Sequence, residues 1–177
     1  LGQIEERDRQ LKRHSEGLER LVEERTHELR EALAAAQADG STRVVVLRGA
    51  GGHFSAGADI KDMAGARMRL AHDPEAIVKV NAAFGELCVA FADTPLAVVA
   101  VVEGAVMGGG IGLACVADVT IAGTSAVFRL PETSLGVVPA QIAPFLVERL
   151  GYAEAKRLAV TGGRLDVGIA RGAHSFE

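Results

Sequence analysis

The sequence contains no tryptophan, only two cysteines and few aromatic residues, which make up 4% of its 177 positions. Because 49% of the residues are nevertheless apolar, we expect a sizeable core that is mainly aliphatic. Cys88 and Cys115 lie in apolar runs without C-x-x-C spacing, so the sequence predicts neither a disulfide framework nor a cysteine metal site. Buried, unpaired cysteines are typical of a reducing compartment, and we expect the protein in the cytoplasm.

An excess of basic charge and long apolar runs are also missing. The formal net charge is −4, which argues against a nucleic-acid surface. No apolar run approaches the roughly 18 residues of a membrane span, and the charged N-terminus lacks the apolar segment of a signal peptide. The five histidines show no metal-ligand spacing. We therefore expect no nucleic-acid or membrane partner, no metal and no separate cofactor.

The character of the chain changes once, near residue 40. Seventeen of the first 40 residues are charged, against 25 of the remaining 137. Apolar residues recur at helical spacing over 3–38, which predicts one long helix that can break at Gly17 and that ends at Asp39-Gly40. A solvated amphipathic helix, a coiled-coil dimerisation helix and a disordered leading segment are the three interpretations of this pattern. We divide the chain into this segment, 1–40, and a second one, 41–177.

The segment after Gly40 alternates between strand and helix patterns. Apolar runs predict strands at 44–47, 96–102, 119–122 and 127–130, and the second run has no polar alternation, so we expect it to be buried on both faces. Helices are expected from Pro74 to before Pro95, over 113–117, from Pro139 or Pro144 to Leu150, and over 153–160. This alternation predicts an α/β architecture with mostly parallel strands.

Two glycine-containing loops follow predicted strands and lead into predicted helices. The first spans 104–112 and holds five glycines, and the second spans 55–59. The start of a helix offers unpaired N–H groups and the positive end of its dipole, which suits an anion or a developing oxyanion. Two such loops in one chain favour a two-armed oxyanion hole. The alternatives are glycines that only permit tight helix–sheet packing, and an ordinary loop at 55–59.

Glu132 is the candidate base, because it follows an apolar strand and Pro131. Apolar neighbours would raise the pKa of this carboxyl toward the range that suits proton transfer. The alternative is a surface glutamate in a turn.

These motifs, in this order, resemble the crotonase (enoyl-CoA hydratase/isomerase) superfamily over about residues 26–166. The resemblance rests on 54–60 (FSAGADI), 106–113 (VMGGGIGL), Ala117-Asp118, Pro131-Glu132 and Leu135-Gly136. It implies the α/β spiral core of the ClpP/crotonase fold, preceded here by the long helix. It also implies a set of site residues. These are the oxyanion-hole N–H groups of Ala58 and Gly109, Glu132 as catalytic acid/base, and a coenzyme A site at Ala56, Asp59, Ile60, Lys61 and Gly108.

The resemblance implies an acyl-CoA hydratase in which coenzyme A enters only as part of the substrate. Many hydratases carry a second glutamate where this chain has Gly112, so a double-bond isomerase with one glutamate base is an alternative. Glycine at that place, together with 135–145 (LGVVPAQIAPF), resembles the subset that hydrates isohexenylglutaconyl- and methylglutaconyl-type thioesters.

Both ends of the chain depart from the family pattern. Residues 18–29 instead resemble the signalling-helix linkers found beside sensor kinase domains, and 167–177 does not continue the helices that close the family's pocket. We therefore expect a truncated or fused form of the family's core. A catalytically silent oligomerisation module is the third candidate function, after the hydratase and the isomerase. The resemblance implies a homo-oligomer, either a trimer or a hexamer.

Overall fold

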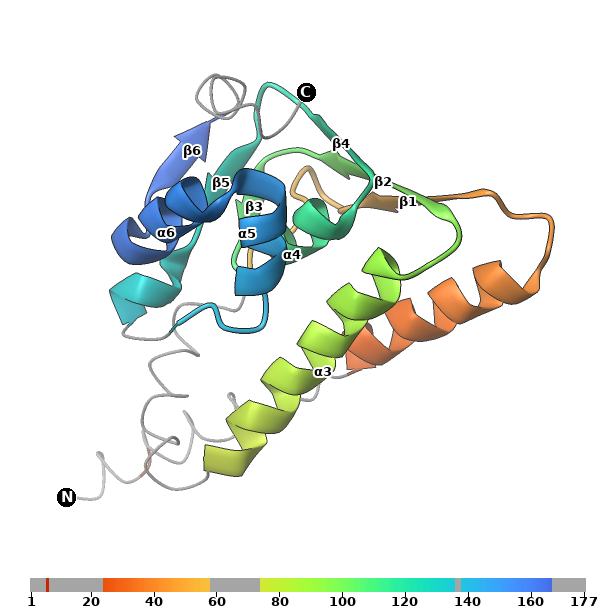
Figure 1. The fold of residues 1–177 in the computed structure, drawn as a ribbon, viewed down its shortest axis with the longest axis horizontal. Coiled ribbons are helices and arrows are strands. Elements are labelled where there is room, and N and C mark those ends of the chain that lie inside the picture. The colour runs from red at the N-terminus through yellow and green to blue at the C-terminus, as the bar shows by residue number, and fades with distance from the viewer. Residues whose placement is uncertain (1–5, 7–23, 58–73, 136–137, 167–177) are drawn as a thin grey trace.

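The computed structural model describes residues 6, 24–57, 74–135 and 138–166 (Figure 1). Residues 24–38 are helical. The elements that follow are β1 (Val44–Arg48), α3 (Pro74–Ala92), β2 (Ala97–Val102), β3 (Ala105–Met107), α4 (Gly109–Val116), β4 (Val119–Ala122), β5 (Val127–Arg129), a 3-10 helix η1 (Pro131–Leu135), α5 (Ala143–Leu150), α6 (Tyr152–Thr161) and β6 (Arg164–Asp166). The predicted α/β class is confirmed.

The described strands form two three-stranded sheets. In the first, β2 lies between β1 and β4 and pairs in parallel with both, with Val99 opposite Val46 and Val119. In the second, β5 pairs in parallel with β3 and antiparallel with β6. The prediction of mostly parallel pairing is confirmed, while β3 and β6 were not predicted from the sequence.

One face of the first sheet forms part of the core. On β2, Val98, Ala100 and Val102 are buried, as expected for alternate residues of a strand that packs on one side. The prediction that this strand is buried on both faces is wrong, because Val99 and Val101 are only partly buried. Their neighbours on the same face are about half exposed, namely Val44, Val46, Val119 and Ile121.

The helix over 24–38 packs against α3 rather than standing free. Leu33 is buried in the core, and the Arg30 guanidinium pairs with the Glu86 carboxylate of α3 at 2.8 Å. The helix ends as predicted at Asp39-Gly40, where the Asp39 carboxylate accepts hydrogen bonds from Ser41 and Thr42. Most of 3–23 lies outside the described residues, and both the division of the chain at residue 40 and the likeness to a signalling helix stay predictions.

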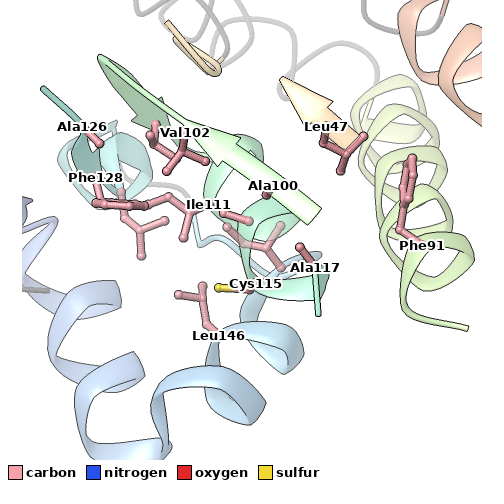
Figure 2. Close-up of a cluster of buried hydrophobic side chains, with 14 of the residues drawn as sticks. Leu47, Phe91, Ala100, Val102, Ile111, Cys115, Ala117, Ala126, Phe128 and Leu146 are labelled. Atoms are coloured by element: carbon pink, nitrogen blue, oxygen red, sulfur yellow. The ribbon is translucent and has the colours of Figure 1, made fainter. Parts of the chain in front are cut away.

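The core is largely aliphatic, as the composition predicted. Figure 2 shows Phe91 of α3 beside Leu47 of β1, and Leu146 of α5 near Cys115 of α4. Both cysteines are buried and unpaired, and burial raises the pKa of each thiol to about 12. Among the described helices, none has the length and apolar character that crossing a bilayer requires.

Candidate active site

The two glycine-containing loops lie side by side at the end of β3. Ser55 forms a parallel bridge with Val106: its N–H donates to the Ala105 carbonyl at 2.9 Å, and its carbonyl accepts from the Met107 N–H at 2.9 Å. Gly57 follows with a φ of 74°, and a Cβ there would lie 3.2 Å from the Met107 carbonyl oxygen. Residues 55–57 therefore run along β3 toward the start of α4.

The chain turns sharply at Gly108 before α4 begins. Gly108 has a φ of 53°, which favours glycine, and its N–H donates to the Arg129 carbonyl of β5 at 3.1 Å. Its own carbonyl accepts from the Ile111 N–H at 2.9 Å, so α4 starts at Gly109. Because the first N–H groups of a helix have no acceptor within it, the N–H of Gly109 has no acceptor inside α4.

The glycines at the start of α4 also permit very close packing. A Cβ on Gly109 would lie 2.7 Å from the Phe84 ring of α3, and one on Gly110 would lie 2.5 Å from Cβ of Ser55. These distances are far below the roughly 3.5–4.0 Å of relaxed carbon contacts. The glycine run therefore permits close packing, here against the helix α3 and against Ser55, and Gly109 at the start of α4 is partly buried. The oxyanion role of this helix start stays a prediction.

Glu132 places a buried carboxylate against the Gly108 turn. It lies in η1 directly after β5, and only 7% of its surface is exposed. Its Oε1 is 2.9 Å from the position that a Cβ on Gly108 would take, and its Oε2 has no hydrogen-bond partner among the described residues. Burial raises the pKa of this carboxyl, and a bond from the residue's own backbone N–H lowers it by less. The predicted desolvation is confirmed, and the alternative of a surface glutamate is wrong.

A buried base beside a glycine turn at a helix start is an arrangement suited to proton transfer next to a carbonyl. The sequence model of the family described as enoyl-CoA hydratase/isomerase matches residues 12–171. The chain belongs to the enoyl-CoA hydratase/isomerase family, within the crotonase superfamily. Its fold is correspondingly crotonase-like.

Relatives of known structure or curated function agree with this assignment. AtuE of Pseudomonas aeruginosa is 55% identical, with a TM-score of 0.78 over 86% of this chain and 58% of that one. The mitochondrial enoyl-CoA hydratase domain-containing protein 2 of Mus musculus is 39% identical over 81% of this chain and 47% of its own length. The mitochondrial methylglutaconyl-CoA hydratase of Rattus norvegicus is 31% identical over 78% of this chain and 42% of its own length. The chain thus spans about half the length of the curated relatives it matches.

The crotonase-like core brings together part of the predicted site. Gly108, Gly109 and Glu132 are adjacent, and Ala56 is exposed on the neighbouring loop. The four other predicted residues lie outside the described residues: Ala58, Asp59, Ile60 and Lys61. The catalytic and coenzyme A-binding roles of all eight stay predictions. Within the described ranges, no cluster of three or more His, Cys, Asp or Glu side chains could hold a metal.

Three side chains that were not predicted from the sequence shape this part of the fold. Ser55 accepts a hydrogen bond from the Gly57 N–H at 3.3 Å, Phe84 covers Gly109, and Ile142 fills the space beside Gly112. Phe84 and Ile142 lie 25 and 30 residues from the glycines they cover, and no local pattern marks such contacts. Ser55 lies within the motif at 54–60, but the sequence alone does not predict a hydrogen bond to its hydroxyl.

Proposed function

We propose that the chain is an acyl-CoA hydratase that adds water to a 2-enoyl thioester through an enolate. The observation that carries this proposal is the buried Glu132 carboxylate, whose Oε2 has no partner among the described residues and whose Oε1 lies against the Gly108 turn. A buried carboxylate oxygen without a partner is costly, so its presence beside the Gly108 turn favours a chemical role. Membership of the family supports a coenzyme A thioester as the substrate.

The proposed reaction uses one base and two main-chain donors. Glu132 takes a proton from water as the water oxygen bonds to C3 of the enoyl group. The electron pair of the C2=C3 double bond shifts to form a C1=C2 bond, and the carbonyl π pair moves onto the thioester carbonyl oxygen, which accepts hydrogen bonds from the N–H groups of Ala58 and Gly109. Glu132 then returns the proton to C2, and the carbonyl re-forms. Each donor is worth about 3 kcal/mol and the positioned base about 10²–10⁴-fold in rate.

The substrate class we propose is a branched glutaconyl-type thioester. Support comes from the likeness to the methylglutaconyl-CoA hydratase of Rattus norvegicus and from the segment 135–145. Coenzyme A would lie along Ala56, Gly108 and the residues Asp59, Ile60 and Lys61. We place the enzyme in the cytoplasm as a homo-oligomer, a trimer or hexamer, as the family resemblance implies.

Double-bond isomerisation is the second candidate, and one observation favours it. A Cβ on Gly112 would overlap Ile142, so this position holds no second carboxylate. One carboxylate is sufficient to remove a proton from C2 of a 3-enoyl thioester and to deliver it to C4.

Absorbance of the conjugated thioester separates these functions. A hydratase bleaches the absorbance of 2-enoyl-CoA, whereas an isomerase generates that absorbance from 3-enoyl-CoA. We expect bleaching with 3-methylglutaconyl-CoA, and a loss of at least about 10²-fold in kcat for Glu132→Gln. Glu148→Gln, on the exposed part of α5, is the matched control and should retain the wild-type rate. Coenzyme A binding without turnover of either substrate would contradict both functions and favour a silent oligomerisation module.

A further inference from the structure

Gly112 and Ile142 form a tightly matched pair in the interior. Both are buried, and the Ile142 side chain has no exposed surface. A Cβ on Gly112 would overlap Cγ2 of Ile142 and would lie 3.1 Å from its Cβ and 3.5 Å from Sγ of Cys88. Since relaxed carbon contacts are about 3.5–4.0 Å, no side chain at position 112 fits beside Ile142.

This overlap is specific to the pair rather than a consequence of general crowding. Gly85, on the neighbouring helix α3, also faces the segment before α5, yet a Cβ there would lie 3.6 Å from Cβ of Gln141. That is an ordinary contact. The residues before α5 therefore leave room for a methyl group at Gly85 but none at Gly112. The difference is the β-branch methyl of Ile142.

Position 112 belongs to the helix face that carries the proposed oxyanion donor. Gly112 lies three residues after Gly109, and residues at this spacing share a face of a helix. The two glycines contact the same helix, because Gly109 faces Phe84 and Gly112 faces Cys88, both on α3. A side chain at position 112 would therefore project from the same face of α4 as Gly109, whose N–H is the proposed oxyanion donor.

We infer that Ile142 is a specificity-determining residue: its side chain occupies the space of a residue at position 112, excludes a second carboxylate there and leaves proton transfer to Glu132. The chemical part of this inference rests on the proposed function, and the packing part does not. With one carboxylate, the proton that Glu132 takes from water is the proton it returns to carbon. A single ionisation should then govern the rising limb of the pH–rate profile.

The packing part is tested by thermal unfolding of Gly112→Ala in four backgrounds. With wild-type Ile142, we expect Tm to fall by about 2–12 °C, because an extra methyl is forced into a filled space. Ile142→Val keeps both γ carbons and should leave this loss unchanged. Ile142→Leu removes the β-branch methyl at nearly constant volume and should remove most of the loss, as should Ile142→Ala. Gly85→Ala should have the same small effect in all four backgrounds.

The chemical part is tested by the pH dependence of kcat/KM with 3-methylglutaconyl-CoA. Wild type should show one ionisation on its rising limb, and the double variant Gly112→Glu/Ile142→Ala should show two. Equal Tm losses for Gly112→Ala in the leucine and wild-type backgrounds would overturn the inference. So would a second ionisation in Gly112→Glu alone. Absence of wild-type turnover would reject the proposed function, while the unfolding series would still decide the packing.

Discussion

Replacing Glu132 with glutamine should lower kcat by at least about 10²-fold and yet stabilise the fold at neutral pH. Glu132 is 7% exposed, and burial raises the pKa of its carboxyl above the ordinary value of 4.5. Between pH 4.5 and the raised pKa, Glu132 is protonated in the folded chain and ionised in the unfolded chain. The free energy of unfolding therefore falls as pH rises through this window, and the loss is complete above it. Glutamine has no proton to lose, so the variant avoids this loss.

The magnitude follows from the linkage between protonation and folding. Each pH unit inside the window costs the wild type about 1.36 kcal/mol. For a chain of this length, 1 kcal/mol corresponds to about 2–4 °C in Tm, so wild type should lose about 3–5 °C per unit. Below pH 4.5 both forms carry a neutral group, and the two melting temperatures should converge.

Thermal unfolding followed by circular dichroism from pH 4 to pH 8 measures this difference. The variant should melt above wild type at pH 8, and the gap should close as pH falls toward 4.5. Glu148→Gln, which changes an exposed carboxylate of α5, is the matched control and should follow wild type at each pH. A glutamine variant that melts below wild type at pH 8, or a gap that is constant across the range, would refute the assignment of a desolvated carboxylate.

Three further substitutions test the Gly108 turn beside this carboxylate and one hydrogen bond each at β3 and α4. In Gly108→Ala, an alanine would have to adopt a φ of 53°, and its Cβ would lie 2.9 Å from Oε1 of Glu132. The free energy of unfolding in denaturant should therefore fall by about 1–3 kcal/mol, and kcat should fall as well. His53→Leu removes the Nδ1 acceptor of the Ala105 N–H, a bond of 3.0 Å, and should lower Tm by about 2–4 °C. Thr120→Val deletes a buried hydroxyl that donates to a carbonyl of α4 at 2.8 Å, and urea unfolding should show a loss of about 1–3 kcal/mol.

Features with local chemical causes were predictable from the sequence. The first helix ends at Asp39-Gly40 because the carboxylate accepts the following N–H groups and glycine adopts a φ of 70°. The helix α3 begins at Pro74, where the fixed φ of proline suits a first turn. At both helix ends, the determining residues lie within a few positions of one another. The burial of Glu132 was one of two interpretations that the apolar strand and proline before it allowed, and the structure decides between them.

Features that depend on distant partners were not predictable. The strands β3 and β6 have three residues each, and they exist because β5 pairs with both. The exposure of one face of β2 depends on what packs against the sheet, and a uniformly apolar run carries no information about that. Glycine at position 112 was visible in the sequence, but the side chain that fills the space beside it, Ile142, lies 30 residues away.

The glycines of α4 show why packing and catalysis need not be competing explanations. Phe84 can lie against Gly109 only because that residue has no Cβ, and the same contact covers the start of the helix with an apolar ring. A hydrogen bond to a developing charge is stronger where water is excluded, since the local dielectric constant is lower. The close approach of α3 to α4 would therefore strengthen the donor that it shields. On this argument, Phe84→Ala should lower kcat with a smaller effect on KM, whereas a purely structural role predicts a loss of Tm without a change in kcat.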